Sequence, residues 1–139
     1  MYTVLLPIDE NPKRAKAQAA YVATLPDAAN AVDVTILHVF ADDDSLDPDD
    51  DEIKRDPKAV DSVKLAMEFL DDEGISYAVL KDRADPIDAI LDQAEELEVD
   101  AIVLGGRKRS PAGKVLFGSH SMSILRNTDT PVVLTGIAE

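Results

Sequence analysis

The sequence predicts an α/β fold in which an open, doubly wound sheet of five parallel strands is covered by helices on both faces. Two observations lead to this prediction. Five short runs rich in Val, Ile and Leu alternate with helix-like segments, and near-continuous apolar runs are typical of strands covered on both faces. Strict alternation of strands and helices implies right-handed crossovers between parallel strands. The length fits one domain over residues 1–139.

The elements follow in order along the chain. Asn11, Asp56 and Asp85 each precede a proline, which is the pattern of an N-cap followed by proline at the first helical position. A fourth helix is predicted to be capped by Ser119. The predicted strands are 3–8, 32–40, 75–80, 100–104 and 131–135, and the predicted helices are 12–25, 57–74, 86–97 and 119–127.

The chain is strongly acidic. It has 28 acidic against 14 basic residues and a net charge of −14, and 20 of the acids are aspartate. Self-repulsion of this size destabilises a compact fold at low ionic strength, whereas multimolar salt shortens the Debye length to about 3 Å or less. We therefore expect a halophilic protein. The same charge argues against nucleic acid as a partner, because a phosphate backbone requires a basic face.

Composition excludes several further classes of protein. The chain has no cysteine, which rules out disulfides, thiolate metal sites and cysteine nucleophiles. The first residues lack the basic region of a signal peptide, and Asp9 and Glu10 interrupt the first apolar run. We therefore expect a cytoplasmic protein that does not interact with membranes.

One loop reverses the sign of the charge. Residues 101–128 contain no acid, and four of the 14 bases lie within residues 107–114. Gly105 leaves the predicted fourth strand at its carboxyl end, where open α/β sheets bind ligands, and glycine lets the backbone approach a phosphate closely. Gly118 and Ser119 open the last helix, whose N-terminus attracts anions. This arrangement favours an anion site. In the alternative interpretation the glycines only form turns and the bases only offset nearby acids.

The loop and its flanks resemble the universal stress protein family, and the resemblance covers the whole chain. ATP-binding members of that family carry glycine, two residues, glycine, nine residues, glycine, and then serine or threonine. Gly105 matches the first glycine and Gly118 with Ser119 the last pair, whereas Lys108 stands where the second glycine is expected. Other matching segments are Val4-Leu5-Leu6-Pro7-Ile8-Asp9, Leu37-His38-Val39, Asp85-Pro86 and the residues from Asn127 to Leu134.

The resemblance implies strand order 3-2-1-4-5 and an ATP site at the carboxyl ends of the strands. Pro7 and Ile8 resemble residues that line adenine and ribose, and Val39 resembles the residue whose main chain recognises adenine. Asp9 resembles the acid on the ribose and metal side of the nucleotide. The resemblance places five residues at the phosphates: Gly105, Gly118, Ser119, His120 and Ser121. The glycines and bases of the loop itself add Gly106, Arg107 and Lys108 to the predicted site.

Three titratable residues are candidates for a chemical role. Asp9 can hold Mg²⁺ through water beside a phosphate, or it can cap the helix that follows. His38 lies within an apolar strand and is expected to be a hydrogen-bonded core residue. His120 follows the start of a helix with no carboxylate at a motif spacing to orient it, so we predict no catalytic residue.

The strand from Pro131 to Thr135 is expected at a sheet edge. An apolar, uncharged edge invites pairing with another chain. The resemblance implies antiparallel pairing of this strand in a two-fold homodimer.

Two functions compete at this point. The first is an ATP-binding stress or signalling module with slow or absent hydrolysis. The second is a dimeric interaction protein that has lost the nucleotide, which the lysine at position 108 favours.

The first prediction concerns salt. The free energy of unfolding should rise steeply from dilute buffer to multimolar KCl, because salt screens the repulsion among the acids. Chemical denaturation followed by circular dichroism at several KCl concentrations measures it. Stability that is flat from dilute buffer upward would contradict the halophilic interpretation.

Overall fold

A computed structural model describes residues 1–40, 56–83, 85–106 and 118–136 of the chain. Five strands form one sheet in the order β3-β2-β1-β4-β5, and every neighbouring pair is parallel. The predicted sheet and strand order are therefore confirmed, and the ends of the strands differ from the prediction by one or two residues. The strands are β1 (Tyr2–Pro7), β2 (Val32–Val39), β3 (Ser76–Asp82), β4 (Ala101–Gly105) and β5 (Val132–Thr135).

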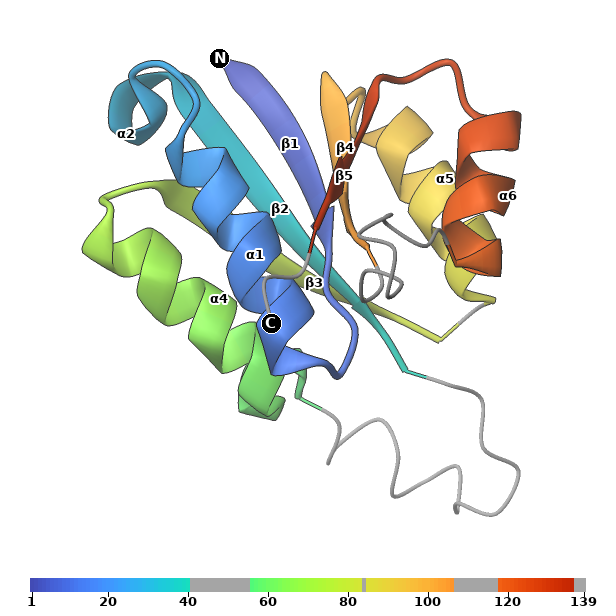
Figure 1. Ribbon diagram of the computed structural model, residues 1–139, viewed down its shortest axis with the longest axis horizontal. Coiled ribbons are helices and arrows are strands. Elements are labelled where there is room, and N and C mark those ends of the chain that lie inside the picture. The colour runs from blue at the N-terminus through green and yellow to red at the C-terminus, as the bar shows by residue number, and fades with distance from the viewer. Residues whose placement is uncertain (41–55, 84, 107–117, 137–139) are drawn as a thin grey trace, which may run out of the picture.

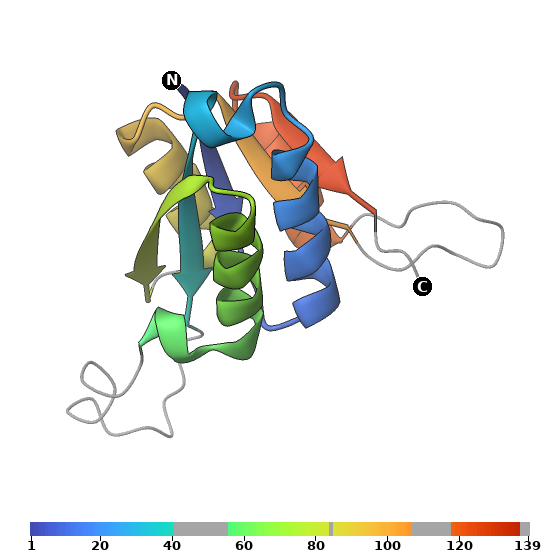
Figure 2. The ribbon, with the colours of Figure 1, turned by 90° about the vertical axis from the view of Figure 1, so that its left-hand side faces the viewer.

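Helices cover both faces of the sheet (Figure 1). On one face α1 (Pro12–Ala23) packs beside α4 (Asp61–Asp72), as Figure 2 shows, and on the other face α5 (Pro86–Glu96) packs beside α6 (Ser119–Asn127). Within the described residues no helix is both long enough and apolar enough to span a membrane.

The central strand β1 is buried from both sides. Val4 and Leu6 contribute to the core beneath α1 and α4, whereas Leu5 contributes to the core beneath α5 and α6. All three side chains are fully buried. This explains the continuous apolar run in the sequence, since alternate residues of a strand point to opposite faces and here both faces are covered.

Two of the predicted N-caps open regular helices. The side chain of Asn11 accepts hydrogen bonds from the backbone N–H groups of Lys13 and Arg14, and Asp85 accepts them from Ile87 and Asp88. In each helix a proline occupies the first turn, where its missing N–H costs nothing.

The helix predicted from residue 57 is interrupted, which corrects the prediction. Asp56 caps only a 3₁₀ turn, η1 (Pro57–Ala59), and Val60 then adopts an extended backbone with ψ 128° before α4 begins at Asp61. Val60 packs against the buried core beneath α1 and α4. This tertiary contact, together with the weak helix preference of a β-branched residue, accounts for the break.

Two other differences concern short local structure. A single helical turn, α2 (Ala28–Ala31), precedes β2 and was not predicted; it follows Asp27, whose φ is 54°. Helix α6 is capped by Gly118, and Ser119 is its first helical residue, so the prediction of Ser119 as the cap is wrong.

Helices α4 and α5 end in the same hydrogen-bonded motif. Gly74 donates to the carbonyl of Asp71 and Ile75 to that of Leu70, and the last turn of α5 repeats these bonds around Glu98. The residue after the cap is left-handed in both, with φ 71° at Gly74 and 50° at Glu98. Glycine adopts this conformation freely, whereas a residue with a Cβ is strained by about 1 kcal/mol or more.

The second prediction exploits this difference. Glu98→Gly should raise the free energy of unfolding by up to about 1 kcal/mol, and Gly74→Ala should lower it by about 1 kcal/mol. A Cβ at Gly74 would lie 3.8 Å from the Cβ of Ala29, an ordinary contact, so strain alone acts there. Chemical denaturation in KCl measures both changes.

A control for Glu98→Gly lies in the same helix. Glu96 is helical and exposed, so Glu96→Gly should destabilise the protein by about 1 kcal/mol. If Glu96→Gly and Glu98→Gly change the free energy of unfolding in the same direction, the left-handed backbone at Glu98 is not strained as we argue.

Candidate functional site

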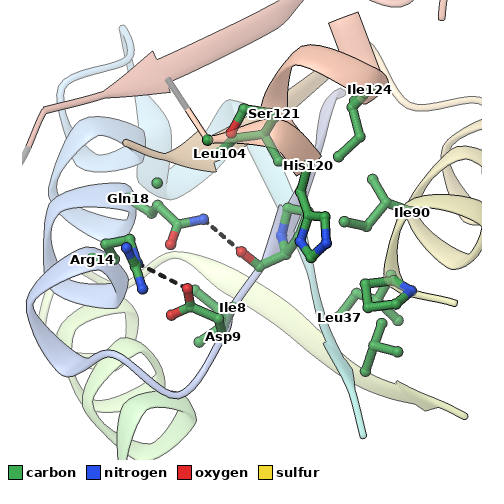
Figure 3. Close-up of a pocket in the computed structure, with 15 residues that line it drawn as sticks. Ile8, Asp9, Arg14, Gln18, Leu37, Ile90, Leu104, His120, Ser121 and Ile124 are labelled. Atoms are coloured by element: carbon green, nitrogen blue, oxygen red, sulfur yellow. Dashed lines mark hydrogen bonds and ion pairs between the residues drawn. The ribbon is translucent and has the colours of Figure 1, made fainter. Parts of the chain in front are cut away.

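A cavity opens at the carboxyl ends of β1 and β4, between α1 on one side and α5 with α6 on the other (Figure 3). Its volume is about 350 Å³. The chain leaves β1 toward one face of the sheet and β4 toward the other, so this is the switch point at which doubly wound sheets bind ligands.

The cavity has an apolar and a polar part. The apolar lining comes from the ends of the strands and from α5 and α6: Pro7, Ile8, Leu37, Val39, Pro86, Ile90, Leu104 and Ile124. The remaining lining residues are Asp9, Arg14, Gln18, Gly105, Gly118, His120 and Ser121.

Gln18 holds the two central strands where they separate. The register pairs β1 with β4 at Val4–Ala101 and Leu5–Ile102. Farther along, the buried Nε2 of Gln18 donates to the carbonyl of Pro7 at 2.6 Å and to that of Val103 at 2.9 Å. One amide group from α1 therefore satisfies carbonyls on both strands at the base of the cavity.

Gly105 lets α1 approach the end of β4. A Cβ at this position would lie 3.0 Å from both the Cβ and the Cδ of Arg14, and 3.1 Å from Oε1 of Gln18. These distances are shorter than nearly all real Cβ contacts. The sequence predicts glycine here because a phosphate approaches the backbone closely. The structure gives a second reason, which is that α1 packs too close to this position to leave room for a Cβ.

Asp9 supports the turn that leads into α1. Its Oδ1 accepts the backbone N–H of Asn11 at 2.8 Å, and its Oδ2 lies 2.8 Å from Nε of Arg14. The buried Nε lacks the alignment of a hydrogen bond, so the second contact is a charge pair without directed geometry. Asn11, and not Asp9, provides the N-cap, which corrects one of the two roles predicted for Asp9.

The N-terminus of α6 faces the cavity. Gly118 has an extended backbone with φ −73° and ψ 159°, and it has no side chain with which to cap the helix. The N–H of Met122 donates to the carbonyl of Gly118, so the amides of residues 119–121 precede the first intrahelical bond. The first turn carries no acid, and its dipole favours an anion.

The structure brings eight of the predicted residues to the cavity: Pro7, Ile8, Asp9, Val39, Gly105, Gly118, His120 and Ser121. Gly106 and Ser119 do not line it. The N–H of Gly106 donates to the carbonyl of Thr135 at 2.7 Å and extends the pairing of β4 with β5. Arg107 and Lys108 lie outside the described residues.

His38 is buried, as expected for a core histidine. Its Nδ1 lies 2.7 Å from the carbonyl oxygen of Ile8, and its ring packs edge-on against Phe40 with the centroids 4.7 Å apart. The imidazole therefore ties the ends of β1 and β2 together.

Sequence reasoning missed the contribution of α1. Gln18 lies between the buried Ala15 and Ala19, and a polar residue within a buried helical stripe is the signal that could have identified it. Arg14 lies three residues after the cap Asn11, in the turn nearest the end of β1. Of the apolar lining residues, Pro7, Ile8 and Val39 were predicted at the site, whereas the others were recognised only as members of strands and helices: Leu37, Pro86, Ile90, Leu104 and Ile124.

The sequence matches the universal stress protein family over residues 1–136. The chain belongs to this family. Its structure is similar to that of a universal stress protein from Archaeoglobus fulgidus, with a TM-score of 0.75 and 26% identity over 97% of this chain and 98% of that one. No curated protein sequence matches this universal stress protein.

Two further structures share the fold. One is an Archaeoglobus fulgidus universal stress protein in complex with dAMP, with a TM-score of 0.71 and 20% identity over 97% of this chain and 98% of that one. The other is an Arabidopsis thaliana protein of the family with AMP bound, with a TM-score of 0.69 and 15% identity over 99% and 93% of the two chains.

The third prediction tests the close packing at Gly105. Gly105→Ala should lower the free energy of unfolding by about 1–3 kcal/mol, because the new methyl group displaces Arg14 or Gln18. Gly136→Ala is the matched control, since a Cβ there meets nothing within 4 Å and the change should stay within about 0.5 kcal/mol. Equal unfolding free energies of the two variants would show that α1 tolerates the methyl group.

Proposed function

We propose that this universal stress protein binds ATP in the cavity between β1 and β4, and that it acts in stress response or signalling in the cytoplasm. The main observation behind the proposal is that one cavity combines an apolar lining with a helix N-terminus that attracts anions. The lining residues from the strand ends and α5 are mostly apolar, whereas the N-terminus of α6, which no side chain of the described residues caps, opens on the same space. An adenine nucleotide has the matching halves, an apolar ring and an anionic phosphate chain.

The dimensions and charge of the site support this ligand. About 350 Å³ falls within the range of roughly 300–1,000 Å³ typical of small-molecule sites. A phosphate at α6 would meet the free amides of residues 119–121 and the positive end of the helix dipole. Residues 101–128 contain no acid in a chain of net charge −14, so the lining residues that β4 and α6 contribute bring no negative charge to the cavity.

The relatives support the class of ligand. Two similar structures hold dAMP and AMP, both adenine nucleotides. In this chain we propose that Val39 and Ile8 contact the base and ribose, and that Gly118, Ser121 and the loop residues Arg107 and Lys108 contact phosphate.

We also propose slow or absent hydrolysis. Asp9 is the one carboxylate among the described residues of the cavity lining, and both its oxygens are engaged, by Asn11 and by Arg14. It is therefore poorly placed to activate a water molecule. Nucleotide binding would then act through a change of conformation or assembly.

The assembly we propose is a homodimer formed by antiparallel pairing of β5. This strand lies at the edge of the sheet, and Val132, Val133 and Leu134 remain half-buried in the single chain. A second copy would satisfy the open edge.

The fourth prediction tests the anion site. Gly118→Asp should cap α6 and at the same time place a negative charge where the phosphate binds. We expect ATP affinity to fall at least roughly tenfold, while the free energy of unfolding stays equal or rises. Isothermal titration calorimetry with ATP and Mg²⁺ in multimolar KCl measures the affinity of each variant for ATP.

Gly118→Asn is the matched control, because asparagine caps a helix as well as aspartate does but carries no charge. It should retain ATP binding far better than Gly118→Asp. Equal affinities of the two variants would contradict a phosphate at α6. If the unmodified protein binds no ATP at millimolar concentration, the alternative of a dimeric interaction protein without nucleotide is favoured, as Lys108 in place of the family glycine suggests.

A further inference from the structure

Arg14 occupies a position that the stability of its helix does not explain. Asn11 caps α1, so Arg14 is the third helical residue, where glutamate or glutamine would complete a capping box. The N-terminal end of a helix dipole disfavours a cation, and the first turn of α1 contains no acid to offset it. A requirement outside the helix therefore accounts better for an arginine here.

The surroundings of Arg14 fix its stem and leave most of its donors unused. The Cβ and Cδ pack against Gly105, and the side chain is only 26% exposed. A guanidinium carries five N–H donors. Among the described residues its only polar contact is the charge pair between Nε and Asp9, and this buried nitrogen makes no directed hydrogen bond.

The side chain lies at the edge of the cavity. Figure 3 shows Arg14 reaching from α1 toward Asp9, with Gln18 above it on the same helix. Arg14 lines the cavity, and so do Gly118 and Ser121 of the anion-attracting turn of α6. A cation and a helix N-terminus therefore border one space.

Asp9 does not fit the role of a magnesium ligand in this arrangement. Mg²⁺ in nucleotide sites is held by one or two carboxylates together with the phosphates. The Oδ1 of Asp9 accepts the N–H of Asn11, and its Oδ2 lies against the guanidinium of Arg14, whose positive charge repels a cation at this carboxylate.

We propose that Arg14 contacts a phosphate of the bound nucleotide, and that Asp9 serves as its counter-ion and not as a ligand for Mg²⁺. The inference rests on the nucleotide-binding function proposed above and assigns two residues of that site. An arriving phosphate offers the guanidinium the charge-assisted, bidentate bonds that its contact with Asp9 lacks. Asp9 holds the side chain at the cavity edge through Nε, which leaves the terminal guanidinium nitrogens for the phosphate.

The fifth prediction compares Arg14→Gln with Lys13→Gln. Both variants remove one positive charge from the same helical turn, but Lys13 does not line the cavity. Arg14→Gln should weaken ATP binding at least roughly tenfold, as loss of a charge-assisted hydrogen bond does, and Lys13→Gln should weaken it less than about threefold. Isothermal titration of the full chain in multimolar KCl gives both affinities.

The unfolding midpoint of Arg14→Gln separates a binding role of Arg14 from a structural one. Glutamine keeps the Cβ and Cδ that pack on Gly105 and restores the residue type favoured at this helical position, so Arg14→Gln should unfold at the same denaturant concentration as the unmodified protein or a higher one. A lower unfolding midpoint accompanied by an unchanged ATP affinity would assign Arg14 a structural role and overturn the inference.

Asp9→Asn tests whether Asp9 is a ligand for Mg²⁺, because asparagine retains an oxygen for the N–H of Asn11 but carries no charge. Titrations with Mg²⁺ and with EDTA give the effect of the metal on ATP affinity in each protein. We expect the ratio of the ATP affinities with Mg²⁺ and with EDTA to be the same in Asp9→Asn as in the unmodified protein. Loss of that effect in Asp9→Asn would show that Asp9 serves the metal.

ATP titration of the unmodified protein distinguishes failure of the proposed function from failure of the role assigned to Arg14. If it binds no ATP in the same titration, the proposed function fails and the role of Arg14 falls with it. If it binds ATP and Arg14→Gln binds equally well, only the role of Arg14 is overturned.

Discussion

The site depends on the way in which β1 and β4 separate, and a single buried amide holds that geometry. Gln18 donates from α1 to one carbonyl on each strand, at the point where their register ends. A buried carbonyl without a partner costs about 1–3 kcal/mol, so two such groups would otherwise oppose the opening of the sheet. The cavity can exist between the strands because a helix supplies the hydrogen bonds that the sheet does not.

The same contact places α1 close to the sheet and thereby positions the polar edge of the cavity. Gly105 permits the approach, and Arg14 lies one turn before Gln18 on the helix. Asp9, at the exit from β1, then meets Arg14. On the opposite face α6 presents its N-terminus to the same space. Helices from the two faces of the sheet thus border a single cavity, which is where we propose that the nucleotide binds.

Most of the fold could be predicted because its signals are local. Apolar runs and the Asn-Pro and Asp-Pro pairs locate the five strands and the starts of α1 and α5. The break at Val60 escaped prediction because it arises from packing against a core that local sequence does not specify. The turn α2 was missed because its four residues carry no periodic pattern.

The site was predictable where a motif or a strand end marks it, as at Asp9, Gly105 and Gly118. Arg14 and Gln18 were missed because their role depends on how closely α1 approaches β4, a distance that a sequence pattern does not contain. Gly106 lies beside the motif but does not line the cavity, because its N–H donates to the sheet at Thr135.

The most direct test of the account is an NMR titration of the ¹⁵N-labelled protein with ATP in high KCl. If ATP binds in the cavity, the backbone amides of Val39, Gly105 and residues 119–121 should show saturable shifts, and so should the side-chain amide of Gln18. The amides of β3 should change little. Shifts confined to other surfaces, or none at millimolar ATP, would contradict it.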